Sequence, residues 1–101
     1  MEKPLFVPLM TEHFEAFAAG TKPEEFRPYG AQWNERTCRP GRRVTLSHGY
    51  GKHRRLHGTV TGFRVVGADA HPALPALYPG RDQFAAIAIR LDGADAPQAQ
   101  E

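Results

Sequence analysis

Short apolar runs separated by turn residues predict that most of the chain forms β-strands. Residues 4–9 are apolar and bounded by prolines, which is typical of a strand at the edge of a sheet. Alternating apolar and polar residues predict three further strands, over residues 44–47, 58–66 and 84–91. A glycine-rich stretch over 48–57 separates two of them, so we expect a hairpin with a long loop there.

The helical signals are fewer. Over residues 12–19 the apolar residues recur at helical spacing. We expect Thr11 to cap the amino end of this helix and Gly20 to cap its carboxyl end, because glycine readily adopts the left-handed conformation found there. A second, shorter helix is expected over residues 72–77. The expected order at the start of the chain is therefore a strand, a helix and then a charged segment.

Residues 31–37 are expected to make two helical turns that use Trp33 as their apolar anchor. Core packing is the favoured interpretation of Trp33. The alternative is an exposed aromatic, with Tyr29 nearby, on which an unpaired base stacks.

Composition is typical of one small domain. The sequence has 101 residues, of which 41% are hydrophobic, which suffices for a single core. We expect an α+β fold in which about five strands form a curved or closed barrel with two or three short helices. The folded domain should span residues 1–92, with a flexible tail over 93–101.

No apolar run is long enough for a membrane-spanning helix, and the amino terminus lacks the pattern of a signal peptide. We therefore expect a cytoplasmic protein without membrane partners, and a monomer by default. The single cysteine, Cys38, cannot form an internal disulfide, and we expect a small, partly buried side chain.

Several charged residues lie close together just after the first helix, with the spacing Gly20-x-Lys22-x-x-Glu25-x-Arg27. If this segment is extended, Glu25 and Arg27 share one face and point toward a cleft or solvent, while Phe26 points into the core. Two cations and one carboxylate on rigid backbone can bind phosphate or move protons. The alternative is a solvated turn with weak ion pairs.

Charge is distributed unevenly along the chain. Residues 36–64 contain eight Arg or Lys and no Asp or Glu, whereas the rest has five basic and eleven acidic residues. The segment thus carries +8 against −6 elsewhere. Such segregation predicts a basic face that attracts polyanions, unless the arginines spread over several faces.

The loop over 48–57 lies in the middle of this basic segment. Tyr50 stands between glycines, where little core is available to bury it, and Lys52, Arg54 and Arg55 follow it. We expect Tyr50 to stack on a base and the cations to contact the phosphate backbone. The loop also contains His48, His53 and His57, whose role stays open; no metal is assigned to them.

The charged segment at 20–27 resembles the hallmark motif of the ASCH domain family, a branch of the PUA-like superfamily, in its small single-domain bacterial or phage form. The segments over 40–46 and 78–84 are also similar to a barrel-strand entry and to the turn before the last strand in that family. The resemblance covers nearly the whole expected domain. It implies a PUA-like β-barrel with flanking helices.

The resemblance implies binding of RNA, or of single-stranded nucleic acid, without a cofactor. The expected binding residues are Lys22, Glu25, Arg27, Tyr50, Lys52, Arg54 and Arg55. One alternative is an enzyme in the same cleft, with Lys22 and Glu25 as the catalytic pair. Another is a small ligand-binding or partner-binding domain whose basic loop is incidental. A ribonuclease is favoured over a 4-acetylcytidine amidohydrolase, because that branch has a threonine nucleophile where this chain has Glu25.

Overall fold

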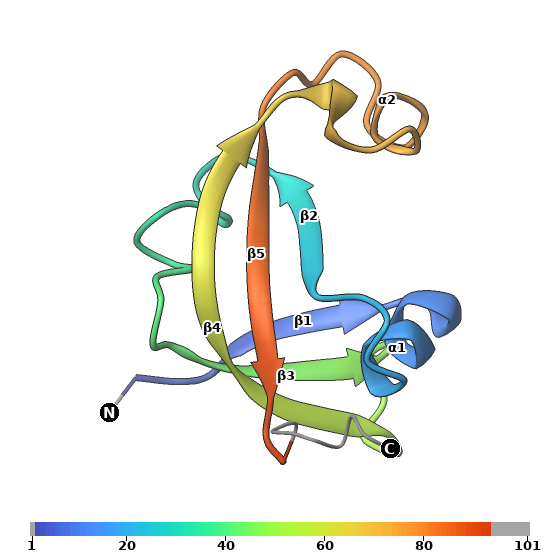
Figure 1. The fold of residues 1–101 in the computed structure, drawn as a ribbon, viewed down its shortest axis with the longest axis vertical. Helices are drawn as coiled ribbons and strands as arrows, with labels where there is room; N and C mark the ends of the chain where they lie inside the picture. Colours follow the sequence, from blue (N-terminus) through green and yellow to red (C-terminus); the bar gives the residue numbers. More distant parts are fainter. Residues whose placement is uncertain (1, 94–101) are drawn as a thin grey trace.

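Five strands form one mixed sheet that curls into a half-barrel in the computed structural model, which describes residues 2–93 (Figure 1). The order across the sheet is β1-β3-β4-β5-β2, so β1 and β2 are its two edges. The strands are β1 (Leu5–Leu9), β2 (Glu24–Pro28), β3 (Arg43–His48), β4 (Arg55–Val66) and β5 (Phe84–Leu91).

The curl comes from the two longest strands. β4 has 12 residues, bends along its length, and pairs with β3 over its first half and with β5 along most of its length (Figure 1). Its register with β5 shifts between Val60 and Gly62, where one extra residue forms a bulge. A bulge increases the local twist and bends the strand. β1 pairs in parallel with β3, while the other three pairings are antiparallel.

Gly58 allows the backbones of β4 and β5 to cross closely. A Cβ atom at this position would lie 2.5 Å from the carbonyl oxygen of Arg90, a distance that real Cβ atoms do not reach. Gly62, on the same strand, is different, because a Cβ there would meet only the Ala88 Cβ at 3.6 Å. The tight crossing at Gly58 is therefore specific to glycine.

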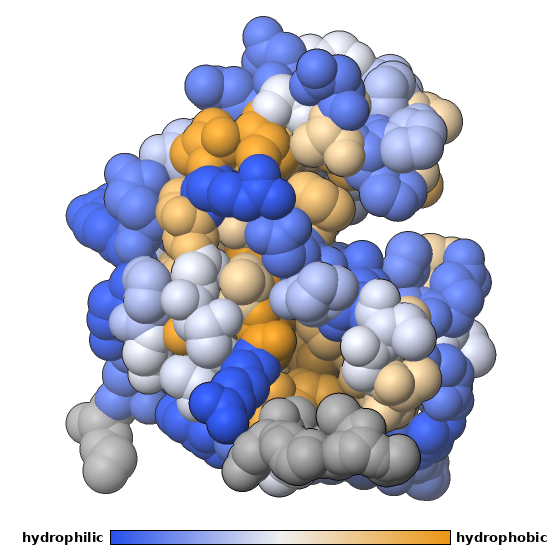
Figure 2. Space-filling model, viewed as in Figure 1, coloured by the Kyte–Doolittle hydropathy of each residue, from blue (hydrophilic) through white to orange (hydrophobic). Residues whose placement is uncertain are grey.

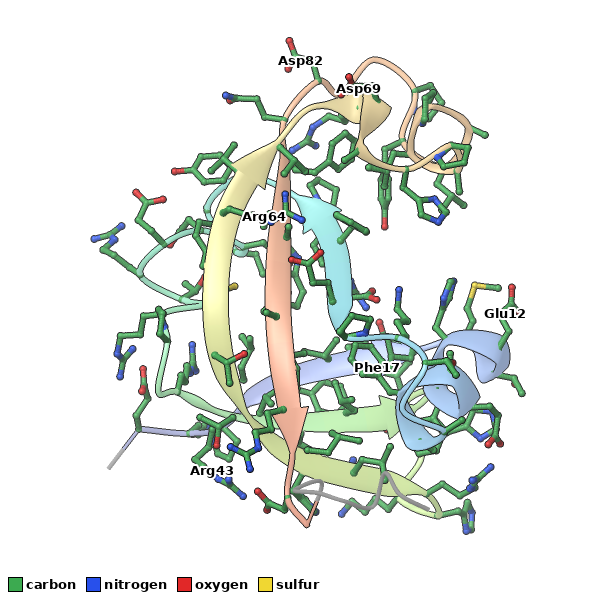
Figure 3. The ribbon with its side chains drawn as sticks, viewed as in Figure 1. Glu12, Phe17, Arg43, Arg64, Asp69 and Asp82 are labelled. Atoms are coloured by element: carbon green, nitrogen blue, oxygen red, sulfur yellow. The ribbon has the colours of Figure 1, made fainter. Side chains whose placement is uncertain are left out.

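The core lies inside the curl of the sheet. Helix α1 (Thr11–Ala18) packs on β1 and β3 and buries Phe14 and Phe17 almost completely. Figure 3 shows Phe17 directed from α1 toward the sheet. Trp33 and Cys38 belong to the same core, so the core interpretation of Trp33 is confirmed, and Cys38 is fully buried.

The ends of α1 match the prediction at one end only. Gly20 has φ +81° and its N–H bonds to the Phe17 carbonyl, so the expected glycine cap is confirmed. Thr11 is not the N-cap. It is already the first helical residue, Met10 is the N-cap, and the Thr11 hydroxyl instead lies 2.7 Å from His48.

The expected helical turns over residues 31–37 are wrong, because the segment forms bends and turns. The buried Asn34 side chain takes over the hydrogen bonds that a helix would satisfy. Its amide donates to the Gly30 and Ala31 carbonyls, and its side-chain oxygen accepts from the N–H groups of Arg36 and Thr37. Asparagine competes with the backbone in this way and favours turns over helix.

Between β4 and β5 the chain forms an arm, residues 67–83, that contains η1 (Ala68–Ala70) and α2 (Leu74–Leu77). The expected helix at 72–77 is confirmed in this shorter form. The arm packs on the outer face of β5, where Leu74 and Phe84 are buried and the Tyr78 ring lies 5.7 Å from the Phe84 ring. β5 is therefore buried on both faces, and the arm stands beyond the sheet (Figure 1).

The expected α+β class with a curved five-strand sheet is confirmed by this fold. The expected tail over 93–101 lies, apart from Gly93, outside the described residues. Within the described part of the chain, none of the helices has the length and apolar character needed to cross a membrane.

Replacing Gly58 by alanine should destabilise the protein by about 1–3 kcal/mol, because the new Cβ collides with main chain that cannot move aside easily. Gly62→Ala is the matched control on the same strand and should change the free energy of unfolding by less than about 1 kcal/mol. Urea denaturation of both variants measures the difference. Equal stability of the two variants would contradict the close crossing at Gly58.

Candidate functional site

A cleft of about 230 Å³ opens between α1, the edge strand β2 and the arm. Figure 2 shows the hollow between the arm and the body of the molecule. Its walls are mainly apolar, and a few charged or imidazole groups stand among them. The lining residues are Pro8, Leu9, Met10, His13, Lys22, Glu25, Phe26, Arg27, His71, Ala73, Leu74, Leu77 and Tyr78.

Glu25 lies between two cations at the base of this cleft. Its carboxylate is 2.8 Å from the Arg27 Nε and 3.4 Å from the Lys22 Nζ, and the residue is only 7% exposed. The predicted sharing of one strand face by Glu25 and Arg27 is confirmed by this contact. The motif therefore brings its three charged residues together in a concave site, rather than in a solvated turn.

Phe26 does not point into the core as expected. Residues alternate along a strand, so the side chain of Phe26 lies on the face opposite Glu25 and Arg27, in register with Ala86 of β5. It is half-buried, and its ring lies 6.0 Å from the His71 ring of the arm. The inner face of β2 is thus charged, and the outer face holds the phenyl ring as a cleft wall.

Arg27 connects the two edges of the sheet. Its Nη2 donates a 2.7 Å hydrogen bond to the Pro8 carbonyl of β1, while its Nε contacts Glu25 on β2. The guanidinium also lies 5.0 Å from the centre of the Trp33 ring. Two of its nitrogens are therefore engaged within the protein, and Lys22 is the cation with more freedom to meet a ligand.

Two histidines of the cleft were missed by sequence reasoning. His13 comes from α1 and His71 from the arm, and both line the cleft beside Lys22 and Glu25. The sequence gives no local signal for either, because 58 residues separate them and neither lies in a charged motif. Only the folding of the arm over β2 places them in one site.

The basic loop lies apart from the cleft, since Tyr50, Lys52, Arg54 and Arg55 are all absent from the cleft lining. The loop is shorter than the expected 48–57, because β3 continues to His48 and β4 begins at Arg55. Arg54 forms an ion pair with Glu15 of α1, and its guanidinium lies 4.9 Å from the centre of the Phe14 ring. The opposite side of α1 supplies His13 to the cleft. The helix thus stands between Arg54 and the cleft.

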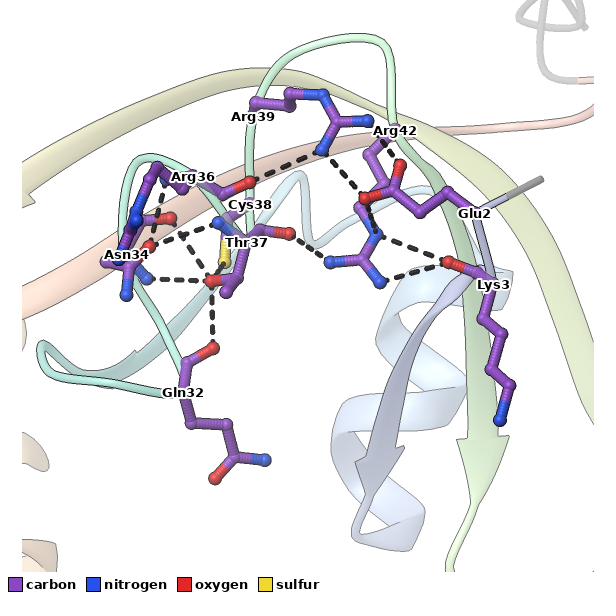
Figure 4. A network of polar contacts seen from close by, with 9 residues as sticks. All are labelled: Glu2, Lys3, Gln32, Asn34, Arg36, Thr37, Cys38, Arg39 and Arg42. Atoms are coloured by element: carbon purple, nitrogen blue, oxygen red, sulfur yellow. Dashed lines mark hydrogen bonds and ion pairs between the residues drawn. The ribbon is translucent and has the colours of Figure 1, made fainter.

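Most arginines of the acid-free segment pair with acids from outside it. Within residues 2–93, Arg39 and Arg42 pair with Glu2, and the other pairs are Arg43–Asp92, Arg54–Glu15 and Arg64–Glu24. Figure 4 shows both arginines around Glu2, with Arg42 also donating to the Lys3 and Thr37 carbonyls. Figure 3 shows Arg64 lying across β5 toward β2. The basic segment is therefore largely neutralised internally.

These surface pairs shift the titration of their carboxyl groups. The hydrogen bond from Arg54 lowers the pKa of Glu15, and bonds from Arg39 and Arg43 lower the pKa of Glu2 and Asp92 in the same way. A lowered carboxyl pKa stabilises the fold above the pKa of the unfolded chain. That contribution is lost as the pH falls through the folded pKa.

The remaining cations of the loop surround exposed aromatic rings. Tyr50 is 82% exposed and its ring lies 6.1 Å from the Phe6 ring of β1, which is 37% exposed. The Arg55 guanidinium lies 5.4 Å from the centre of the Phe6 ring. Neither Arg55 nor Lys52 forms an ion pair with a described residue. We call Phe6, Tyr50, Lys52 and Arg55 the aromatic platform.

The three loop histidines do not form a cluster. His48 contacts Thr11 and lies beside the Phe14 ring, whereas His57 approaches the Thr45 hydroxyl on the outer face of the sheet at 3.3 Å. Over the part of the chain that the structure describes, no group of three His, Cys, Asp or Glu side chains is placed to hold a metal ion.

Removing the Arg27 guanidinium should open the junction between β1 and β2. Arg27→Met should cost about 2–4 kcal/mol, somewhat less than breaking a fully buried pair, because Lys22 still contacts the Glu25 carboxylate. The exposed Arg64–Glu24 pair gives the control, and Arg64→Met should cost less than about 1 kcal/mol. Chemical denaturation tests both, and equal losses would contradict a bridging role for Arg27.

Arg54→Gln should raise the pKa of Glu15 back toward its ordinary value, because the hydrogen bond that lowers it is lost. The stability that this carboxyl group contributes above the pKa of the unfolded chain should then shrink, so acidification should remove less of it. Side-chain carboxyl ¹³C shifts followed by NMR during an acid titration measure this pKa. Arg55→Gln is the matched control and should leave Glu15 unchanged, and a shift in both variants would argue against the contact.

Comparison with known proteins identifies no related family or protein. The sequence matches no protein-family model, and a comparison with curated proteins finds no significant match. The two candidate features of the surface are the cleft at β2 and the aromatic platform on the outer face of β1, where Phe6 alternates with the core residues Leu5 and Val7.

Proposed function

We propose that the protein is a cytoplasmic PUA-like domain of the ASCH type that binds single-stranded RNA. The observation that carries this proposal is the aromatic platform, where an 82% exposed Tyr50 sits against Phe6 with unpaired cations beside it. The curled five-strand sheet with short flanking helices agrees with a PUA-like fold at the level of architecture.

The rings of the platform suit stacking on unpaired bases. Tyr50 lies between Gly49 and Gly51, so neighbouring side chains do not cover its ring. Stacking of a base on an aromatic side chain contributes about 1–3 kcal/mol and requires no particular base. The platform therefore favours a flexible single strand over a duplex, whose bases are already stacked.

The charges around the platform provide the second part of the affinity. Lys52 and Arg55 have no carboxylate partner in the described chain, unlike the paired arginines on other surfaces. Cations that contact phosphates release counterions, so the affinity should fall with salt. Arg54 can join them when a phosphate replaces the Glu15 carboxylate as its partner.

The cleft is the proposed second contact of the same strand. Lys22, 19% exposed in its side chain, meets a phosphate or a base edge, while Glu25 orients it. Arg27 keeps its bond to the Pro8 carbonyl and acts chiefly by holding the Glu25 carboxylate. The platform supplies most of the stacking, and Lys22 supplies charge.

Tyr50→Ala should weaken binding of a labelled, mixed-sequence 12-nucleotide RNA about tenfold, through the loss of one stacked base. Lys52→Ala should weaken it less and should reduce the slope of log affinity against log salt by about 0.7. Fluorescence anisotropy at several salt concentrations measures both effects. Arg54→Ala should also weaken binding.

Arg36→Ala is the control for these variants, because Arg36 is an exposed cation outside the loop and has no ion pair within residues 2–93. It removes the same charge and should leave the affinity nearly unchanged. If Arg36→Ala and Lys52→Ala weaken binding equally, net charge rather than the platform drives association. If Tyr50→Ala binds like the unaltered protein, the stacking proposal is wrong.

A ribonuclease is the second candidate function. It is favoured by the Lys22–Glu25 contact of 3.4 Å in a cleft that His13 and His71 also line. Lys22 would stabilise phosphate charge, and Glu25 or a histidine would move protons. The same RNA incubations, scored for shortened products, decide between the candidates. Turnover that disappears in Lys22→Ala and Glu25→Gln, while Tyr50→Ala retains it, would favour the enzyme.

A further inference from the structure

The strand β2 presents one unpaired edge to the cleft. In an antiparallel pair, alternate residues direct both the N–H and the C=O toward the partner strand. The bonds from Tyr29 N–H to the Gln83 carbonyl and from Ile89 N–H to the Pro23 carbonyl fix this alternation, so Glu25 and Arg27 face β5. The main-chain groups of Glu24 and Phe26 therefore face away from the sheet.

This open edge is short and bounded. On its amino-terminal side the Lys22 N–H already donates to the Ala16 carbonyl, and at the other end Pro28 has no N–H to offer. Between them, Glu24 and Phe26 each supply one N–H and one C=O. Among the described residues, no other group forms a hydrogen bond with the outward main chain of Phe26. The edge is thus a ready partner for a short extended backbone.

The walls around this edge suit a bulky apolar side chain. On the outer side, Phe26 faces the arm, where Leu74, Leu77 and Tyr78 line the cleft. Leu77 is 59% exposed, and Met10, 66% exposed, stands at the α1 side. An apolar residue of an extended segment would lie between these side chains, while its backbone meets that of Phe26.

The charges of the cleft favour an acidic neighbour to that apolar residue. Glu25 already has two cationic partners, and Glu24 is paired with Arg64, so both carboxylates of the edge are compensated. Lys22 and Arg27 together exceed the charge of Glu25 by one unit. A carboxylate beside the apolar residue would therefore meet a net positive site.

We propose that the β2 edge binds an extended peptide by strand addition, with an apolar side chain in the cleft and an acidic residue next to it. Main-chain hydrogen bonds supply the affinity in this mode of recognition, and the pocket for alternate side chains supplies the preference. This inference does not rest on RNA binding, because that proposal depends chiefly on the aromatic platform and shares only the charged residues Lys22, Glu25 and Arg27 with the cleft.

Two features favour a peptide over the other possible occupants. The β2 edge is recessed between α1 and the arm, so the β2 edge of a second copy, recessed in the same way, cannot reach it. A nucleic acid gains most from phosphate contacts, whereas this edge offers neutral main chain with largely apolar walls, and its cation Lys22 is already paired with Glu25.

Amide hydrogen exchange measured by NMR tests the proposal residue by residue. The probe is a blocked heptapeptide with a central leucine between two aspartates and valines outside them. In the free protein, the amides of Glu24 and Phe26 should exchange fast and those of Glu25 and Arg27 slowly. The peptide should slow exchange at Glu24 and Phe26 at least about tenfold, as formation of a hydrogen bond requires.

Two substitutions at one position separate main chain from side chain. Phe26→Ala removes the ring but keeps the N–H, whereas Phe26→Pro removes both, without breaking a bond to β5. Phe26→Pro should therefore bind the peptide about tenfold more weakly than Phe26→Ala. Thermal melting and the dispersion of the amide NMR signals show whether both variants are folded. A peptide with an N-methylated leucine lacks one main-chain N–H. Its affinity for the unaltered protein should be about as weak as that of the unmodified peptide for Phe26→Pro.

Three results would overturn the proposal. The first is an unchanged exchange rate of the Phe26 amide in millimolar peptide. Main-chain pairing tolerates many sequences, so this probe should bind at that concentration if the edge accepts a strand. The second is slow exchange that depends on protein concentration alone, which would assign the edge to a second copy. The third is slow exchange at Phe26 with the 12-nucleotide RNA and not with the peptide, which would assign the edge to nucleic acid. Tyr50→Ala is the control, and it should bind the peptide as tightly as the unaltered protein does, because Tyr50 does not line the cleft.

Discussion

The bond from Arg27 to the Pro8 carbonyl is the contact on which the shape of the site depends. β1 and β2 are the two ends of the strand order, and no main-chain pairing connects them. Arg27 joins them through one side chain while its Nε holds Glu25 and its face covers Trp33. The opening of the half-barrel is therefore fixed by a guanidinium, and the cleft lies beside that bridge. Without the guanidinium, the buried Glu25 carboxylate would keep only the Lys22 contact, and the two edge strands would lose the bond that joins them.

Internal pairing redistributes the charge that the sequence concentrates in one segment. Carboxylates from the amino terminus, α1, β2 and the end of β5 reach five of its eight cations. Each such surface pair contributes little to stability. Together they leave the uncompensated charge of the hairpin loop at Lys52 and Arg55, beside exposed rings. Local neutralisation, rather than a broad basic face, therefore defines where a polyanion is attracted most strongly.

Local patterns were enough to predict the strands, the first helix and the shared face of Glu25 and Arg27, because these follow from alternation and spacing. The turn at Asn34 was missed, because one buried amide outweighed helical spacing. Phe26 was assigned to the core since an apolar residue in a strand usually faces it, but here the arm supplies a second apolar surface. His13 and His71 depend on that same arm, and the partners of the arginines lie up to 49 residues away, so local sequence carries no signal for them.

Pro28 and the already bonded N–H of Lys22 bound the β2 edge, and they also limit how far strand addition can extend. A long unpaired edge is a template on which copies of a chain add to one another and aggregate. Because its two ends are closed in this way and walls stand on both sides, this edge accepts a segment of about two paired residues and offers no continuous ladder. The protein can therefore keep an unpaired strand edge exposed in a crowded cell without aggregating. The length of edge available limits which segments can bind before their sequence does.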